Sequence, residues 1–266
     1  MERTAKVMRA DAAWRDLREN LSFFTRLPVA ASHGVPDFAR IAWAAPLAGA
    51  VVGALGSLAF LVGQWLDLPT LVSAVLAVGT EILVTGALHE DGLADIADGF
   101  GGGATRERKL EILRDSRLGT YGVLALIFSS MLRVFALLSL SRAAGSFACA
   151  GLVLAAAAAR AGALAPLVFL DPARRDGAGA SAGRLPTVAL RSAATTTLLL
   201  AAALGLLWLG LVRALFACVI AAAANFLVLR LADRHIGGQT GDVAGAAALV
   251  TEVTALIALL IGGRAA

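Results

Sequence analysis

The stretch from Glu81 to Gly122, EILVTGALHEDGLADIADGFGGGATRERKLEILRDSRLGTYG, combines many acidic residues with flanks that are apolar enough to cross a bilayer. Within it, Asp91, Asp95 and Asp98 are spaced i, i+4, i+7, which places three carboxylates inside an arc of roughly 60° on a helix. Like charges on one helical face repel unless a cation lies among them. This face therefore predicts a site for a hard divalent cation with oxygen ligands, most often Mg²⁺ where phosphates are also handled.

The composition is that of a membrane protein. Of the 266 residues, 59% are apolar and only 16% are charged, and the mean hydropathy is +0.80. A soluble domain would carry about 25% charged residues. The net charge of +4 does not indicate nucleic-acid binding, because the basic residues lie beside apolar runs and aromatic residues are not interleaved with them.

Seven apolar runs predict an all-α, polytopic transmembrane bundle of about seven spans, with helical and loop elements on the cytoplasmic side. The runs are residues 41–66, 70–88, 118–140, 147–170, 192–212, 214–229 and 243–261. The sixth run is marginal in length for crossing a hydrocarbon core of about 30 Å. Glycines in the first run have spacings that suit close helix packing. No repeat or linker divides the chain, so residues 1–266 are expected to form a single integral membrane domain.

The positive charges predict an orientation. Four polar segments hold eighteen of the 23 Lys and Arg residues. They are residues 1–40, 89–117, 171–191 and 230–242. Because positive segments stay in the cytoplasm, the N-terminus is expected inside and the C-terminus outside. Residues 1–40 are expected to be cytoplasmic or interfacial, with a short amphipathic helix over residues 12–24 before the helix-breaking Pro28.

Two further polar stretches carry candidate binding residues. Asp115, Ser116 and Arg117 stand where the chain re-enters the membrane, and their groups suit phosphate or ribose recognition, although a helix N-cap is the alternative. Residues 237–242 (GGQTGD) open the last apolar run. They suit anion binding at a helix N-terminus, with Asp242 as a further metal or hydroxyl contact; a glycine turn capped by Asp242 is the alternative.

Several charged residues allow two interpretations. Arg106, Arg108 and Lys109 suit substrate phosphates, but they equally suit pairing with neighbouring glutamates on an exposed helix. Arg133, Arg160 and Glu252 lie inside apolar runs, where such residues pair or line a polar cavity. On an ideal helix His89 points about 160° away from Asp91, which favours a structural role.

Taken together, these residues resemble one family, the adenosylcobinamide-GDP ribazoletransferases, also called cobalamin synthases or cobalamin-5′-phosphate synthases. The matching blocks are Phe24-Thr25-Arg26-Leu27-Pro28-Val29, Thr85 to Gly99 with Arg114 to Gly122, Gly237 to Asp242 with Gly245, Ala246 and Glu252, and a weaker block at Pro172-Ala173-Arg174 with Gly177 and Gly179. The blocks occur in the family's order over nearly the whole chain. Glu90 departs from the family pattern, which is mostly apolar there; it would add a ligand or face water.

The resemblance implies a multi-pass enzyme of the bacterial inner membrane that uses Mg²⁺. It would join adenosylcobinamide-GDP to α-ribazole, or to α-ribazole 5′-phosphate, and release GMP. The implied metal ligands are Asp91, Asp95 and Asp98, and the implied catalytic residues are Asp91 and Asp242. The implied substrate-binding residues are Asp115, Ser116, Arg117, Arg174, Gly237, Gly238 and Thr240. Membrane lipid is an expected partner, and a homo-oligomer or a complex with other enzymes of cobalamin synthesis is compatible with the sequence.

Two other classes of membrane protein share some of these features. CDP-alcohol phosphotransferases also place several aspartates on membrane helices around Mg²⁺, but their pattern has an Ala-Arg pair after the first Asp-Gly, whereas Ala94 is followed here by Asp95. A transporter would use Arg133, Arg160 and Glu252 as an ion or substrate path. It would give no reason for a dense acidic and glycine-rich block at the cytoplasmic surface.

Overall fold

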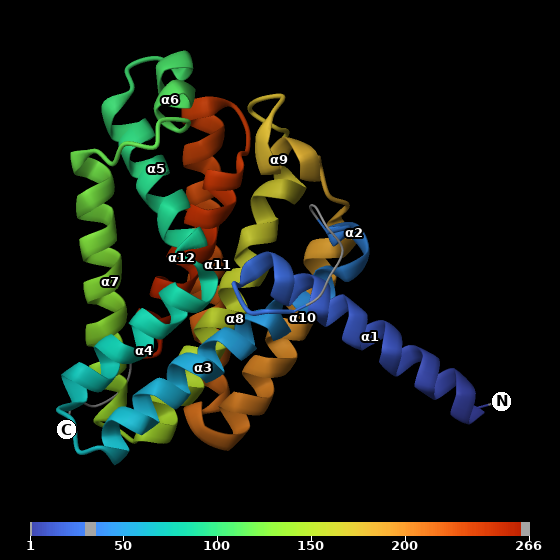
Figure 1. Ribbon diagram of the computed structural model, residues 1–266, viewed down its shortest axis with the longest axis vertical. Helices are drawn as coiled ribbons and strands as arrows, with labels where there is room; N and C mark the ends of the chain where they lie inside the picture. Colours follow the sequence, from blue (N-terminus) through green and yellow to red (C-terminus); the bar gives the residue numbers. More distant parts are fainter. Residues whose placement is uncertain (1, 30–35, 262–266) are drawn as a thin grey trace.

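The computed structural model describes residues 2–29 and 36–261, which fold into helices joined by short loops (Figure 1). The all-α prediction is confirmed. The elements are α1 (Glu2–Phe24), α2 (Phe38–Ile41), η1 (Ala42–Ala44), α3 (Ala45–Trp65), α4 (Thr70–Thr85), α5 (Leu88–Gly102), α6 (Arg106–Ile112), α7 (Thr120–Ser141), α8 (Gly145–Phe169), α9 (Gly177–Ala182), α10 (Thr187–Leu204), η2 (Gly205–Leu209), α11 (Leu211–Ile236) and α12 (Gly241–Ala258).

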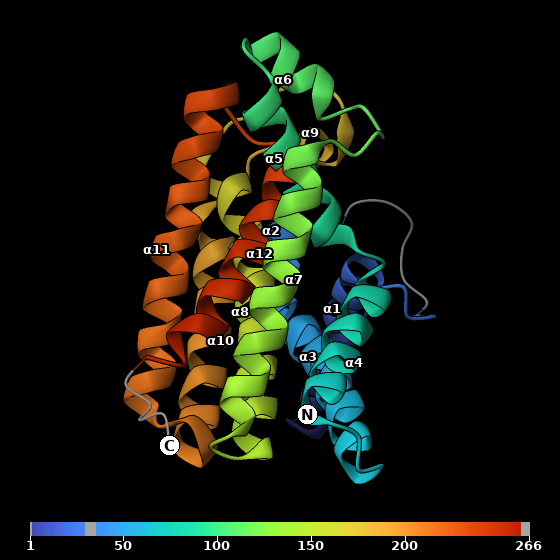
Figure 2. The ribbon, with the colours of Figure 1, turned by 90° about the vertical axis from the view of Figure 1, so that its left-hand side faces the viewer.

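Six helical segments in the described part of the chain are long and apolar enough to cross a membrane. They are residues 38–65, α7, α8, residues 187–209, α11 and α12. Helices α4 and α5 pass the same test only together, and they are bent by 89° at their junction. Figure 2 shows most of these helices running along the long axis of the molecule. If α4 and α5 together cross the membrane once, the number of spans is seven, as predicted.

Two predicted boundaries were wrong. The run 214–229 looked marginal, but α11 has 26 residues, because residues 211–213 and 230–236 extend the helix at its two ends. The acidic residues 91–98, predicted to lie on one helical face, belong to helix α5, which packs against α12 and α7. The N-terminal helix begins at Glu2 instead of near residue 12. Polar residues continued these helices where hydropathy alone indicated an end.

Helix α8 lies at the centre of the bundle, and nearly all of its side chains are buried. Its alanine-rich middle lets α3 approach very closely. A Cβ atom on Gly49 would collide with the Ala156 carbonyl, and one on Gly53 would lie 2.7 Å from the Cα of Val153. The glycine spacing of the first apolar run therefore serves close helix packing, as expected.

The junction between α4 and α5 directs the acidic helix away from the axis of α4. Gly86 and Ala87 both adopt left-handed backbone conformations, with φ of 64° and 58°. Glycine tolerates this region, but alanine is strained in it. The Arg26 amide donates to the Val84 carbonyl at 2.7 Å, and the Arg26 side chain lies against Gly86. The segment after α1 thus braces the bend.

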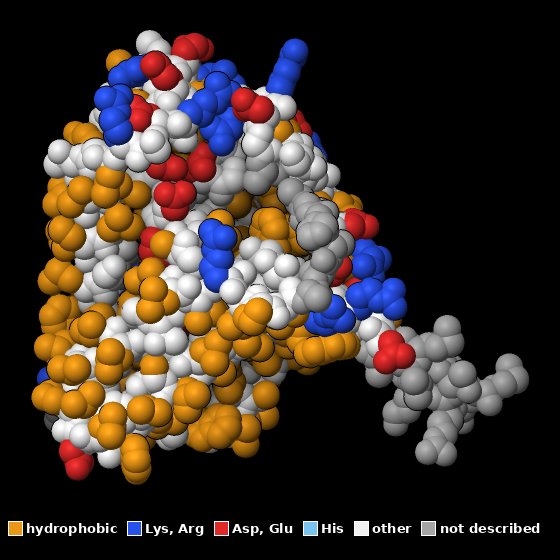
Figure 3. Space-filling model, viewed as in Figure 1, with side chains coloured by type: hydrophobic (Ala, Val, Ile, Leu, Met, Phe, Trp, Pro, Cys, Tyr) orange, Lys and Arg blue, Asp and Glu red, His pale blue; other side chains and the backbone are white. Residues whose placement is uncertain are grey.

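Charge separates along the molecule. In Figure 3 hydrophobic side chains cover the lower part of the visible face, while acidic and basic side chains gather at the upper end, over α5 and α6. A second charged area lies beside α1. An apolar belt with a charged end is the distribution expected of a bundle that spans a bilayer.

Candidate active site

The site forms where α5 and α12 touch. A Cβ atom on Gly92 would lie 2.8 Å from the Asp242 carbonyl oxygen and 3.0 Å from the Cα of Gly245. Only glycine permits this approach, because any side chain at position 92 would force the two backbones apart. The contact brings the first turns of α5, with Asp91 and Asp95, beside Asp242 in the first turn of α12.

Negative charge accumulates at this contact. Asp95 is half-buried, and its electrostatic neighbours are the carboxylates of Asp91, Asp98 and Asp242. Arg174 is the basic neighbour that opposes them. The sequence predicted the acidic face of α5, and the structure adds Asp242 to it from a helix almost 150 residues further along the chain. A site of this kind attracts a cation, or a phosphate whose negative charge is balanced by a bound cation or an arginine.

Asp98 also has a structural contact that its spacing did not indicate. Its two carboxylate oxygens accept hydrogen bonds from the backbone amides of Gly119, at 2.7 Å, and Gly122, at 2.9 Å. These amides open α7, so the carboxylate caps that helix from α5. Within residues 2–29 and 36–261, no group of three or more His, Cys, Asp or Glu side chains is already arranged to hold a metal ion. The ligand set Asp91, Asp95 and Asp98 therefore stays a prediction.

Asp98→Asn is expected to lower the free energy of unfolding by about 1–2 kcal/mol, because one of two charge-assisted acceptors for the α7 amides is lost. Thermal unfolding in detergent measures this change. Glu107→Gln, on the exposed helix α6, is the control and should leave stability unchanged. Unaltered stability with lost metal response in Asp98→Asn would instead make this carboxylate a ligand.

Arg174, predicted to bind substrate, lies next to the predicted catalytic Asp242. Its Nη2 atom is 3.4 Å from Oδ2 of Asp242, and the Thr240 hydroxyl donates to the same oxygen at 3.0 Å. Thr240 also accepts the Val243 amide and so caps α12. The Nη1 atom of Arg174 is buried without a hydrogen-bond partner among the described residues. A buried donor of this kind is costly unless a ligand satisfies it.

The predicted glycines Gly237 and Gly238 join two loops. Gly237 ends α11 with a φ of 65°. The backbone of Gly238 lies against residues 171–173, where a side chain would not fit. Gln239 connects the same two loops. Its backbone amide donates to the Asp171 carbonyl at 2.9 Å, and its side-chain Nε2 donates to the Gly179 carbonyl at 3.0 Å. This join positions Arg174 beside α12.

Arg106 and Arg108, two basic residues of α6, have protein partners. Arg106 donates to the carbonyls of Ile236 at 2.8 Å and Ala173 at 2.7 Å, and so fastens α6 to the joined loops. Arg108 pairs with Glu111 at 2.7 Å. Of the two interpretations, Arg108 shows pairing with a neighbouring glutamate. Arg106 instead braces the joined loops, a role that the sequence did not reveal.

Asp115, Ser116 and Arg117 lie in an exposed loop before α7. Arg117 donates through Nε to Asp115 at 2.9 Å, and these hydrogen bonds lower the pKa of the Asp115 carboxyl to about 2. Among the described residues, no hydrogen bond or ion pair links this loop to Asp91, Asp95 or Asp242. Two residues further on, the Gly119 amide donates to Asp98, so this loop adjoins the acidic face of α5. The substrate-binding role of Asp115, Ser116 and Arg117 stays a prediction.

A buried charge network lies beneath the site and was only partly expected. Arg133 of α7 pairs with Glu90 at 2.8 Å and with Glu252 at 3.2 Å, and Glu252 also pairs with Arg160 at 3.3 Å. Pairing of the three charged residues inside the spans is confirmed. Glu90 is buried and does not face water: its Oε1 ties α5 to α7, while its Oε2 has no hydrogen-bond partner among the described residues. Glu81 is equally buried, yet neither of its carboxylate oxygens has a hydrogen-bond partner in the described chain.

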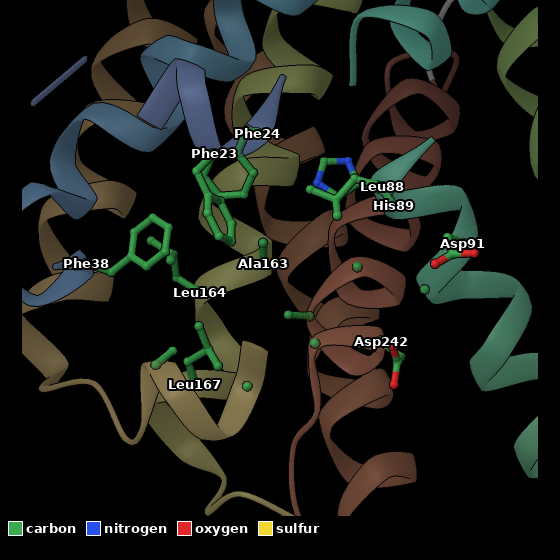
Figure 4. A pocket seen from close by; sticks show the side chains of 16 residues that line it. Phe23, Phe24, Phe38, Leu88, His89, Asp91, Ala163, Leu164, Leu167 and Asp242 are labelled. Carbon is green, nitrogen blue, oxygen red and sulfur yellow. The ribbon is translucent and has the colours of Figure 1, made fainter. Parts of the chain in front are cut away.

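A cavity of about 190 Å³ opens beside the carboxylates (Figure 4). Phe23, Phe24 and Phe38 form one wall, and Asp91 and Asp242 lie on the opposite side. Small and apolar residues complete the lining: Leu88, Gly92, Ala163, Leu164, Leu167, Gly179, Ala182, Gly241, Ala244 and Gly245, together with His89. This wall was not predicted from the sequence, although a Phe-Phe pair at the end of an interfacial helix is a signal for it.

Fold and site together define a polytopic helical membrane protein with a carboxylate and arginine site toward its charged end. The chain belongs to the cobalamin-5-phosphate synthase family, whose model matches residues 16–260. This finding confirms the resemblance seen in the sequence motifs.

Three bacterial relatives are similar over almost their whole length. The chain is 46% identical over 262 residues to an adenosylcobinamide-GDP ribazoletransferase of Azorhizobium caulinodans, covering 97% of this chain and 99% of the relative. It is 47% identical over 246 residues to a protein of the same name from Bradyrhizobium diazoefficiens, covering 91% and 92%. A third, from Xanthobacter autotrophicus, is 45% identical over 261 residues, covering 96% and 98%. No solved structure matches the chain.

Proposed function

We propose that this protein joins adenosylcobinamide-GDP to α-ribazole, or to α-ribazole 5′-phosphate, and releases GMP. The names of the relatives support the reaction class. One observation supports placing the reaction at this site: Asp91, Asp95 and Asp242 meet beside Arg174, whose buried Nη1 atom has no hydrogen-bond partner in the part of the chain that the structure describes. A diphosphate substrate supplies the acceptors that this guanidinium lacks.

The donor set fits Mg²⁺. Carboxylates from two helices face each other, and Arg174 is the basic group that opposes them around Asp95. Hard oxygen ligands of this kind, completed by water and substrate phosphates, are those that Mg²⁺ takes. Asp91, Asp95 and Asp242 would hold the ion, and Asp98, further along α5, would add its negative charge while its carboxylate caps α7. When bound, Mg²⁺ neutralises the diphosphate and the charge of the departing phosphate.

The chain's own residues would perform the remaining tasks. The ribose hydroxyl of α-ribazole attacks the phosphorus joined to the cobinamide side; its proton passes to Asp91 or Asp242, and the bond to the GMP oxygen breaks. Arg174 holds oxygens of the attacked phosphate. For Arg117 to reach a phosphate, its pair with Asp115 must open, so we propose Asp115, Ser116 and Arg117 as outer contacts of the bound nucleotide.

The charged end is proposed to face the cytoplasm of a bacterial inner membrane. Eighteen of the 23 Lys and Arg residues lie in the segments assigned to that side, which supports the orientation. The substrates would then enter from the compartment that contains nucleotides. The exposed apolar belt would contact lipid, and it leaves room for a second copy of this chain or another enzyme of the same synthesis.

Product analysis tests the function. Purified protein in liposomes is given adenosylcobinamide-GDP, α-ribazole and Mg²⁺, and the corrinoid product is identified by mass spectrometry. We expect a product that contains the α-ribazole mass and that disappears when either substrate is omitted. Conversion with α-ribazole 5′-phosphate instead shows which acceptor is preferred. A folded protein that makes no such product with either acceptor would overturn the proposal.

A further inference from the structure

The cavity beside the carboxylates has two chemically different sides. Its apolar wall comes from the end of α1, from α2 and from α8, whereas Asp91 and Asp242 stand at the opposite side (Figure 4). The rings of Phe23 and Phe24 meet edge to face, with centroids 5.0 Å apart, and Phe23 meets Phe38 in the same way. Such a wall offers flat, apolar surface to a ring.

We infer that this cavity holds the dimethylbenzimidazole base of α-ribazole, and that the guanine of adenosylcobinamide-GDP binds elsewhere. The inference rests on the proposed function and adds to it the place of one substrate. With the base between the phenylalanines and α8, the attached ribose lies toward Asp91 and Asp242, where the attacking hydroxyl is required.

Polarity decides between the two bases. Guanine carries a carbonyl, a ring N–H and an amino group on its edges, and burying these groups without hydrogen-bond partners is strongly unfavourable. Dimethylbenzimidazole presents two methyl groups and, when joined to ribose, a single free ring nitrogen. The methyl groups suit Leu164 and Leu167, which line the cavity. Asp91 and Asp242 cannot serve guanine within the apolar half, because they lie across the cavity from it.

His89 supplies the one polar contact that the base needs. It is only 3% exposed, its ring lies 6.2 Å from that of Phe24, and it lines the cavity. Its Nε2 atom is buried without a hydrogen-bond partner among the described residues. An Nε2–H group there donates to the free ring nitrogen of the base and satisfies both atoms. The structural role expected for His89 thus becomes a binding role.

Substrate kinetics test the inference. Ala163→Leu adds volume to the cavity, and we expect the KM for α-ribazole to rise about tenfold while the KM for adenosylcobinamide-GDP stays within about twofold. Ala161→Leu is the matched control, because Ala161 lies two residues away on the same helix and lines a separate apolar groove between α8, α10 and α11. The control should leave both KM values unchanged.

A second measurement needs no variant. With the unaltered protein, the α-riboside of benzimidazole, which lacks both methyl groups, should have a KM about tenfold above that of α-ribazole, since each buried methyl contributes about 0.8 kcal/mol. In the Ala163→Leu variant the KM for this smaller analogue should rise by a smaller factor than the KM for α-ribazole. An unchanged KM for the analogue, or a raised KM for adenosylcobinamide-GDP alone, would overturn the inference. Absence of GMP release with every acceptor would instead reject the proposed function.

Discussion

Asp95→Asn is expected to lower the rate of GMP release about a hundredfold or more, while the protein unfolds at the same or a higher temperature. Asn keeps the shape of the side chain but removes the charge that lies among Asp91, Asp98 and Asp242. Removing a like charge relieves repulsion in the folded state, so stability is retained or gained as activity is lost. A loss of activity without a loss of stability distinguishes a functional carboxylate from a structural one.

The measurement pairs initial rates with thermal unfolding in the same detergent, with and without Mg²⁺. In the unaltered protein Mg²⁺ should raise the unfolding temperature by binding the folded state, and EDTA should reverse the effect. The shift should shrink in Asp95→Asn. Glu111→Gln, which removes an exposed carboxylate paired with Arg108, should behave as the unaltered protein. Full activity in Asp95→Asn would exclude this carboxylate from the site.

The second large effect is expected in the buried network. Glu252→Gln leaves Arg133 and Arg160 without the carboxylate that they share, deep in the bundle. Removing one partner of a buried ion pair typically costs 3–5 kcal/mol, because the charge that remains is uncompensated. We expect a folded yield and an unfolding temperature well below those of the unaltered protein.

Glu81→Gln provides a matched control for that variant. Glu81 and Glu252 are the same residue type with the same exposure, 3% each. Glu81, however, has no hydrogen-bond partner for either oxygen among the described residues, and repulsion from Glu252 and Glu90 opposes the attraction of Arg133 and Arg160. Its replacement should therefore be neutral or stabilising. Equal losses in the two variants would show that burial alone, and not pairing with Arg133 and Arg160, determines the effect.

Hydropathy revealed most of the fold, because a bilayer requires long apolar helices. Hydropathy did not predict those features of the fold that depend on tertiary contacts. The end of α11 was misplaced because its polar last turns lie beyond the apolar run. The bend before α5 depends on a left-handed backbone at Ala87, which no local pattern indicates.

The candidate site was predictable in part for the same reason. Helical spacing placed Asp91 and Asp95 on one face, and the glycine-rich segment pointed to Asp242. Spacing could not show that Asp98 caps α7 or that Glu90 pairs with Arg133, because both partners lie far away in sequence. The aromatic wall was missed because its members come from different elements, and ring contacts between them exist only in the folded chain.

Release of GMP in proteoliposomes tests the central claim most directly, with the unaltered protein compared with Asp91→Ala under identical conditions. We predict Mg²⁺-dependent release that requires both adenosylcobinamide-GDP and α-ribazole, stops in EDTA and falls about a hundredfold or more in the variant. Release from a folded Asp91→Ala protein at the unaltered rate would contradict the assignment of the site. Release that needs no α-ribazole would contradict the transfer reaction itself.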